Sequence, residues 1–372
     1  MRIGRAHILE GEELEVVEGY LEVREGRIEK IGRGFTAHLD LDLKGGFILP
    51  PLFNAHTHLA DAVARELYSG RTQEETVGPG GLKFRVLEET PEQRLVEEMG
   101  LTLRAMLRTG TLAHCDFREG GVRGVKLLRG ISGPWRSVVL GRPVPGEEVE
   151  ELLSVADGLG LPSLCQYPME QLLHAAREVR RRGKILSSHV AELPHRAGEE
   201  IRRALRLGLS LAVHLTHARR KDLSLLRRKG ITAVFCPRSN LLLSSGIPPL
   251  ATALQEGLPF LLGTDNVSVC PPDLWEELRF AWACVRKENP RAGEKEARAL
   301  LRAVTVEPSR FFRLPWGPLE EGGEATFLLL SGGGELRNLR DPYAGLVNRT
   351  RPENIRGLWW RGKDIFKKGV VF

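Results

Sequence analysis

The stretch Phe47-Ile-Leu-Pro-Pro-Leu-Phe-Asn-Ala-His56-Thr57-His58 is the part of the sequence from which the fold can be read. It is an apolar run long enough for a buried strand, and two histidines stand at its end. Residues i and i+2 of a strand lie on one face, so both imidazoles can reach a single point beyond the strand. A His-x-His pair by itself is weak evidence for a metal site. The evidence becomes stronger if other strands end in further possible metal ligands at the same face.

Similar apolar runs recur along the chain, about 25 residues apart, with helical patterns between them. Helices are expected over residues 90–108, 169–182 and 222–229. Five glycines follow helical stretches, as glycines at helix C-termini do: Gly110, Gly183, Gly208, Gly230 and Gly257. The eight expected strands are 47–56, 111–117, 135–140, 159–166, 185–189, 209–214, 231–236 and 260–265.

Eight alternating β-α units are the number that closes a (β/α)8 TIM barrel, and we predict this α/β fold for residues 48–317. An open doubly wound sheet would have the same alternation. However, no Gly-rich dinucleotide fingerprint follows the first strand. A barrel is therefore favoured.

The two ends of the chain resemble each other and differ from the middle. Near the N-terminus, short alternating strands flank a turn at Glu25-Gly26, and strand-and-turn segments return after Pro318, ending in Gly369-Val-Val-Phe372. We expect residues 1–47 and 318–372 to form one small composite β-domain, a β-sandwich that flanks the barrel.

Composition and charge limit the kinds of molecule that the protein is expected to bind. The net charge of +6 comes from 54 basic and 48 acidic residues that are spread along the chain. This favours a solvated surface and no nucleic-acid partner. The five cysteines include no C-x-x-C pair, and neither a signal peptide nor a membrane span is evident. We expect a cytoplasmic protein without membrane association, and a homo-oligomer remains open.

Three further strand ends carry polar side chains that complete a site. His189 ends the fifth expected strand, His214 the sixth and Asp265 the eighth. In a barrel the carboxyl ends of all strands meet at one face, where active sites lie. Imidazoles together with a carboxylate suit Zn²⁺ or Fe²⁺ better than Ca²⁺ or Mg²⁺. The sequence therefore predicts a single divalent metal, zinc or alternatively iron.

Three later motifs, with the opening stretch, carry a family resemblance. They are Ser188-His189-Val-Ala-Glu192, Cys236-Pro-Arg-Ser-Asn240 and Leu262-Gly-Thr-Asp265-Asn266. In order and spacing the chain resembles the amidohydrolase superfamily, in the branch of cytosine deaminases, chlorohydrolase-like enzymes and adenosine-type deaminases. The resemblance covers nearly the whole length.

The resemblance implies a role for each matching residue. His56, His58, His189 and Asp265 correspond to metal ligands, and Asp265 also takes the proton from water. Glu192 corresponds to the general acid. His214 corresponds to the histidine that steadies the attacked centre, with His217 as a rival for that role.

The implied activity is hydrolytic deamination of an aminated heterocycle, such as a nucleobase or nucleoside, by metal-activated water. Residues 159–166 contain no lysine that could bridge two metals, which disfavours the binuclear relatives. Two alternatives are open. One keeps the same site but hydrolyses another C–N or C–Cl bond, and the other is a metal-binding scaffold that has lost catalysis, which we would expect to lack at least one of Glu192, His214 and Asp265.

Substrate contacts are expected from residues on the active face, and residues 61–85 form either a lid or a mobile loop. Arg238 either holds a substrate group or pairs with a nearby acid. The candidate substrate residues are Arg118, Arg238, Asn266 and His217.

Overall fold

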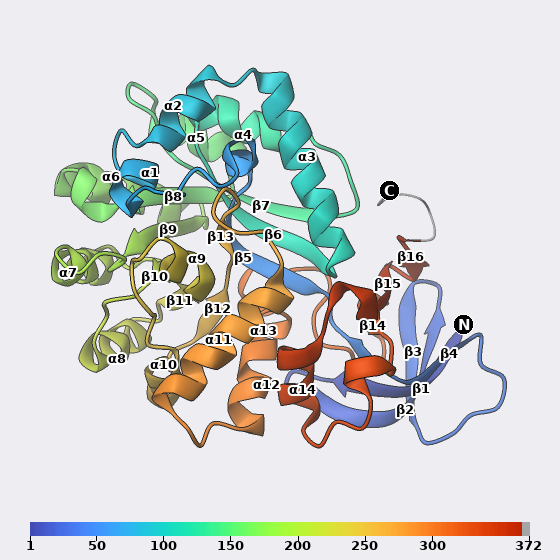
Figure 1. Cartoon of the computed structure of the whole chain (residues 1–372). Helices are drawn as coiled ribbons and strands as arrows, with labels where there is room; N and C mark the ends of the chain where they lie inside the picture. The colour runs from blue at the N-terminus through green and yellow to red at the C-terminus, as the bar shows by residue number, and fades with distance from the viewer. Residues whose placement is uncertain (367–372) are drawn as a thin grey trace.

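The computed structural model describes residues 1–366, and it contains two sheets with helices packed around the larger one (Figure 1). Within residues 1–366, no helix combines the length and apolarity that crossing a membrane requires. The small sheet lies at one side of the barrel, near the N-terminus.

The larger sheet is parallel throughout and closes into the predicted barrel. Its last strand is interrupted, so that β12 pairs with β11 while β13 pairs with β5, and this joins the two edges. In order, the strands are β5 (Leu52–His58), β6 (Thr111–Arg118), β7 (Arg136–Gly141), β8 (Gly158–Ser163), β9 (Ile185–Val190), β10 (Leu211–His214), β11 (Thr232–Phe235), β12 (Phe260–Leu262) and β13 (Asp265–Asn266).

The interruption has a steric reason at Gly263. A Cβ atom built at this glycine would lie 2.6 Å from the backbone nitrogen of His56 and 2.7 Å from its Cβ atom. Only a residue without a side chain allows the two strands to approach this closely. The approach brings Asp265 alongside His58 and Thr57.

Helices surround the barrel because each has one apolar face. In α7 the buried residues Ala197, Ile201, Ala204 and Leu207 recur at helical spacing, and Gly208 ends the helix with φ 65°. The main helices are α3 (Glu92–Arg108), α4 (Gly121–Arg129), α5 (Val149–Val155), α6 (Met169–Arg181), α7 (Ala197–Leu207), α8 (Arg220–Arg228), α10 (Leu250–Glu256), α11 (Leu274–Glu288), α12 (Glu294–Arg302) and α13 (Val306–Phe311). At two strand ends lie η2 (Leu164–Gln166) and the short α9 (Pro237–Leu242).

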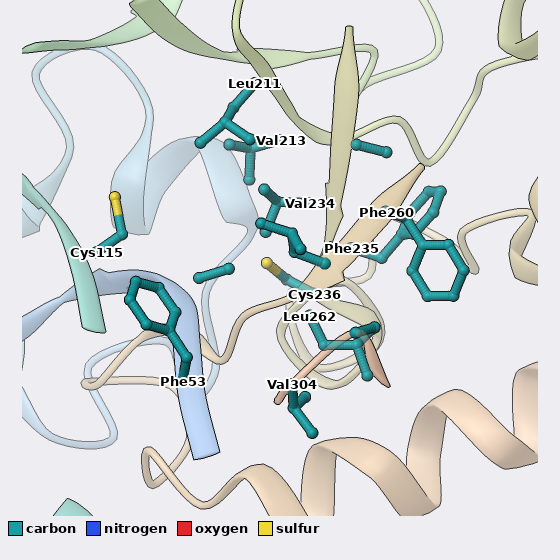
Figure 2. Close-up of a cluster of buried hydrophobic side chains, with 14 of the residues drawn as sticks. Phe53, Cys115, Leu211, Val213, Val234, Phe235, Cys236, Phe260, Leu262 and Val304 are labelled. Atoms are coloured by element: carbon teal, nitrogen blue, oxygen red, sulfur yellow. The ribbon is translucent and has the colours of Figure 1, made fainter. Parts of the chain in front are cut away.

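Apolar side chains from several barrel strands fill the space behind the strand ends (Figure 2). Val213 of β10 lies opposite Val234 of β11 in the parallel register, and both are fully buried. Phe53 of β5 and Leu262 of β12 belong to the same cluster. This core is packed with side chains, and the polar groups that line a cavity lie at the strand ends.

The smaller sheet confirms that both ends of the chain build one β-structure. Its strands, in spatial order, run β16-β15-β14-β4-β1-β2-β3, with β1 and β4 parallel and the other neighbours antiparallel. The two ends of the chain also meet through a backbone hydrogen bond, which Ala325 donates to the Gly26 carbonyl. The sheet has an apolar core of its own, separate from that of the barrel. The strands are β1 (Arg2–Glu10), β2 (Glu15–Arg24), β3 (Arg27–Arg33), β4 (Leu41–Leu49), β14 (Phe327–Leu330), β15 (Ile355–Trp360) and β16 (Lys363–Asp364).

Two expectations about strands were wrong. The run 47–56 is not one strand: β4 of the small sheet ends at Leu49, and β5 of the barrel starts at Leu52. Pro50 and Pro51 separate them, because proline has no N–H to donate to a ladder. The expected strand 260–265 is likewise divided into β12 and β13. The division into domains at residues 47/48 and 317/318 stays a prediction.

The C-terminal part is less β-rich than expected. It includes α14 (Pro342–Arg349), which packs against α11 and α12, and two single turns, η3 (Gly334–Leu336) and η4 (Pro352–Asn354). Asp341 caps α14 by accepting two backbone N–H groups. The strand expected at Gly369–Phe372 lies outside the described residues.

Residues 61–85 fold into short helices. The segment after β5 forms η1 (Leu59–Ala64), α1 (Gln73–Val77) and α2 (Leu82–Glu89). Thr72 and Glu75 make a reciprocal capping box that starts α1. We call residues 72–89 the cover segment, because its side chains line the cavity described next.

Candidate metal centre

Four histidines and one aspartate from different strands meet at the carboxyl end of the barrel. The ring centroids of His56 and His58 are 4.9 Å apart, and His189 lies 5.1 Å from His56 and 5.0 Å from His214. His56 Nε2 lies 3.1 Å from the Asp265 carboxylate oxygen. The strand ends therefore bring together the metal ligands that the sequence predicted.

The backbone turns sharply where these side chains leave their strands. Ala191, His214 and Asp265 have φ angles of 53°, 76° and 62°. Residues with a Cβ atom rarely adopt this region, and such strain is found where a site fixes a side chain. Two of these residues, His214 and Asp265, place their side chains in the wall of one cavity, and Ala191 stands just before Glu192, which lines it as well.

The imidazoles of His56 and His189 have properties that suit a metal ligand. Nδ1 of His56 and Nε2 of His189 are buried and lack hydrogen-bond partners within residues 1–366, while Nε2 of His56 faces the Asp265 carboxylate. Burial lowers the pKa of His56 to about 4 and that of His189 well below its usual range. Neutral rings with unpaired nitrogens fit a divalent cation, since a metal ligand must be deprotonated.

Asp265 supplies the anionic donor. Its oxygen Oδ1 faces His56 and lies 3.5 Å from His58 Nε2, while Ser239 donates a hydrogen bond to Oδ2 over 2.5 Å. Burial raises the pKa of Asp265, but the neighbouring imidazoles, with His56 first, hold it well below its usual range. The carboxylate is therefore ionised and fixed in orientation.

His58 is oriented by a buried network that reaches the cover segment. Its Nδ1 lies 2.9 Å from Glu119 Oε1, which also accepts a hydrogen bond from Lys83 over 2.7 Å. Lys83 forms a second ion pair of 2.7 Å with Asp61. A carboxylate on the far nitrogen of a ligand histidine fixes the ring and leaves Nε2 free to face the metal.

Glu192 and His214 form the other wall. Their closest oxygen and nitrogen are 3.8 Å apart, and both lie with His189 in one group of donor atoms within 4.8 Å of one another. Gln73 of the cover segment donates to Glu192 Oε1 over 3.1 Å, and Asn240 lies 3.0 Å from His214 Nδ1. Glu192 lines the cavity and remains partly exposed, which is compatible with the role of general acid that the sequence predicted.

The predicted substrate residues differ in their placement. Asn266 lines the cavity. Arg118 instead pairs with Glu119, and His217 pairs through Nε2 with the Ser245 carbonyl. Arg238 is buried and pairs with an acid, Glu277, which was one of the two alternatives left open by the sequence. These three side chains are occupied by protein groups.

Sequence reasoning missed the groups that orient the ligands. Ser239 and Asn240 lie in a quoted motif, so their positions carried a signal that was not used. Lys83 and Gln73 lie in the long segment after the first strand, where no periodicity points to the site. Their roles depend on how that segment folds back over the barrel.

Comparison with known protein families matches residues 47–365 to the Amidohydrolase family. The chain belongs to this family. The match spans the barrel and includes all the strand ends that build the metal centre, and it confirms the predicted family and the hydrolase class of this amidohydrolase.

Similar proteins support the same assignment. The chain is 36% identical to a "putative aminohydrolase" of Methanothermobacter thermautotrophicus, over 96% of this chain and 97% of the relative. It is 26% identical to a 5-methylthioadenosine/S-adenosylhomocysteine deaminase of Thermococcus onnurineus, over 100% and 95% of the two chains. A zinc-bound adenosine deaminase of Xanthomonas campestris shares the fold, with a TM-score of 0.83, 18% identity, and coverage of 98% of this amidohydrolase and 92% of that chain.

Proposed function

We propose that this amidohydrolase is a hydrolytic deaminase of an aminated heterocycle, with one divalent ion, zinc in first place, held by His56, His58, His189 and Asp265. The observation that carries the proposal is that an acid, Glu192, lies in one cavity with the imidazoles of His189 and His214, and that His189 Nε2 has no hydrogen-bond partner within residues 1–366. Three nitrogen donors and one carboxylate match the ligand preferences of zinc, with iron as the alternative.

When bound, the ion supplies Lewis-acid activation that makes water a nucleophile at neutral pH. The protein groups then divide the proton transfers. The water oxygen adds to the amidine carbon of the ring, one water proton passes to Asp265, and Glu192 protonates the adjacent ring nitrogen. His214 hydrogen-bonds the attacked centre. When the tetrahedral centre collapses, the C–N bond to the amino group breaks and ammonia leaves with the proton carried by Asp265. The hydroxyl proton of the centre passes to Glu192 as the carbonyl forms, so both carboxyl groups regain their starting states.

The substrate that we place first is an adenine nucleoside or a related purine. The name of the Thermococcus relative, a deaminase of 5-methylthioadenosine and S-adenosylhomocysteine, supports this choice. The cavity also offers amide groups near the acid, from Gln73 and Asn266, which can pair with ring nitrogens or hydroxyls.

The test combines metal analysis with ammonia release from a panel of nucleobases and nucleosides. We expect about one zinc per chain and ammonia from at least one adenine-containing compound. Glu192→Gln should retain the metal, while kcat falls about 100- to 10,000-fold. Glu199→Gln, on the exposed face of α7, is the matched control.

Each part of the proposal can fail separately. Full activity of Glu192→Gln would show that Glu192 is not the acid. One metal per chain without ammonia from any compound would exclude deamination and leave another C–N or C–Cl bond. No metal after reconstitution would contradict the metal centre itself.

A further inference from the structure

Lys83 is a buried cation that the cover segment inserts behind the metal centre. It comes from α2, only 4% of its side chain is exposed, and its ammonium lies 2.7 Å from Asp61 Oδ2 and 2.7 Å from Glu119 Oε1. A lysine is almost never buried without partners of this kind. Neither carboxylate belongs to the proposed ligand set, so the reaction does not account for this arrangement.

The network fixes both oxygens of Glu119. Oε2 accepts a hydrogen bond from Arg118 of the barrel over 2.9 Å, whereas Oε1 is shared by Lys83 and by Nδ1 of His58. The barrel thus holds one oxygen and the cover segment helps to hold the other. The orientation of the His58 ring therefore depends on where α2 sits.

The ion pair with Asp61 stabilises the packing of α2 against the barrel. Its carboxyl group is fully buried and, within residues 1–366, its carboxylate oxygens have no hydrogen-bond partner in addition to the Lys83 ion pair. Withdrawing Lys83 would leave two carboxylates in a buried position with one cation fewer. Such a loss of pairing is strongly unfavourable.

We propose that Lys83 is a positioning residue that latches the cover segment onto Asp61 and Glu119 and, through Glu119, holds His58 ready for the metal. This inference rests on the proposed metal site at His58. It makes metal binding and closure of the cover segment reciprocal: each stabilises the other by the same factor.

The experiment measures Zn²⁺ affinity by chelator competition, and amide hydrogen exchange of residues 82–89, in the full-length protein. Lys83→Met keeps the length of the side chain and removes its charge. We expect a 10- to 100-fold weaker affinity, as for other groups that orient metal ligands, and exchange at least about tenfold faster in α2. Arg85→Met removes an exposed charge from the same helix and should change neither quantity.

A double-mutant cycle tests the route through Glu119. Glu119→Gln should weaken zinc binding to a similar extent, and adding Lys83→Met to it should cause little further loss. If the two losses multiply, or if Lys83→Met binds zinc within about twofold of the wild type, the positioning role is refuted.

A second variant guards against misfolding. Asp61→Asn combined with Lys83→Met removes both members of the Asp61–Lys83 pair, while Glu119 keeps Arg118 as its cation, and the same loss of zinc affinity is expected. If the wild type binds no zinc, the proposed function fails. Hydrogen exchange of α2 then still tests whether Lys83 holds the cover segment against the barrel. Unchanged exchange of α2 in Lys83→Met would then overturn it.

Discussion

Glu277 offers a sharp test of the electrostatics beside the metal centre. It is fully buried on α11 and accepts hydrogen bonds from the backbone and the guanidinium of Arg238, both over 3.0 Å. Burial raises the pKa of Glu277 from 4.5 to about 7, although the Arg238 charge opposes the shift. The residue after Arg238 is Ser239, which contacts Asp265, so this pair supports the site directly.

The sign of the pH effect follows from the raised pKa. The folded protein holds the Glu277 proton more tightly than the unfolded chain, so its contribution to stability is complete below pH 4.5 and is lost as the pH rises to about 7. Each pKa unit is worth about 1.4 kcal/mol. The difference between 4.5 and about 7 therefore corresponds to about 3 kcal/mol in the free energy of unfolding.

Glu277→Gln removes this titration, because the amide keeps the shape and the carbonyl acceptor without the proton. Chemical denaturation of the chelator-treated protein from about pH 4.5 to 8 gives the difference in unfolding free energy between the wild type and the variant. We expect this difference to fall by about 3 kcal/mol as the pH rises. A flat curve for Glu277→Gln would mean that the attraction of Arg238 outweighs the cost of burial, and our reasoning would be wrong.

Three further predictions concern the metal centre. Removing the metal with a chelator should lower the melting temperature, and zinc at about 1,000 times its Kd should restore about 4 kcal/mol of the free energy of unfolding. An unchanged melting temperature would argue against a structural contribution of the metal. Ser239→Ala removes the hydrogen bond to Asp265 and should lower kcat about 10- to 100-fold with little change in KM, whereas unaltered steady-state kinetics would show that the hydroxyl is dispensable. Gly263→Ala places a methyl group against His56 and should cost about 1–3 kcal/mol and reduce zinc content, which calorimetry and elemental analysis would reveal; a normal protein would contradict the packing argument.

Much of the site could be predicted because it follows strand ends. His189, His214 and Asp265 stand directly after apolar runs, and parallel strands must present those ends together. The two strand breaks differ in what the local sequence could show. Pro50-Pro51 divides one apolar run between two sheets, and the two prolines were a local signal that the predicted strand 47–56 did not use. Gly263 interrupts another run where the barrel closes, and that break depends on the approach of His56, a residue distant in the sequence.

The contacts of the predicted substrate residues could not be predicted from local sequence either. Arg238 follows a strand end, as His214 does, yet its guanidinium pairs with Glu277, 39 residues away. Sequence pattern places a side chain on a face, but it does not reveal which partner the side chain meets. The alternatives that we left open for Arg238 were of this kind.

The sequence by itself determined the barrel and the composite β-structure of the two termini, and it named the donors that we propose for the metal, because strand periodicity and strand-end position are local properties of the chain. Only the tertiary structure decided which groups orient those donors. Lys83, Gln73 and Glu119 act through contacts between segments whose separation along the chain carries no pattern. Buried charges are positioned by the partners that compensate them, and those partners are chosen by the packed fold.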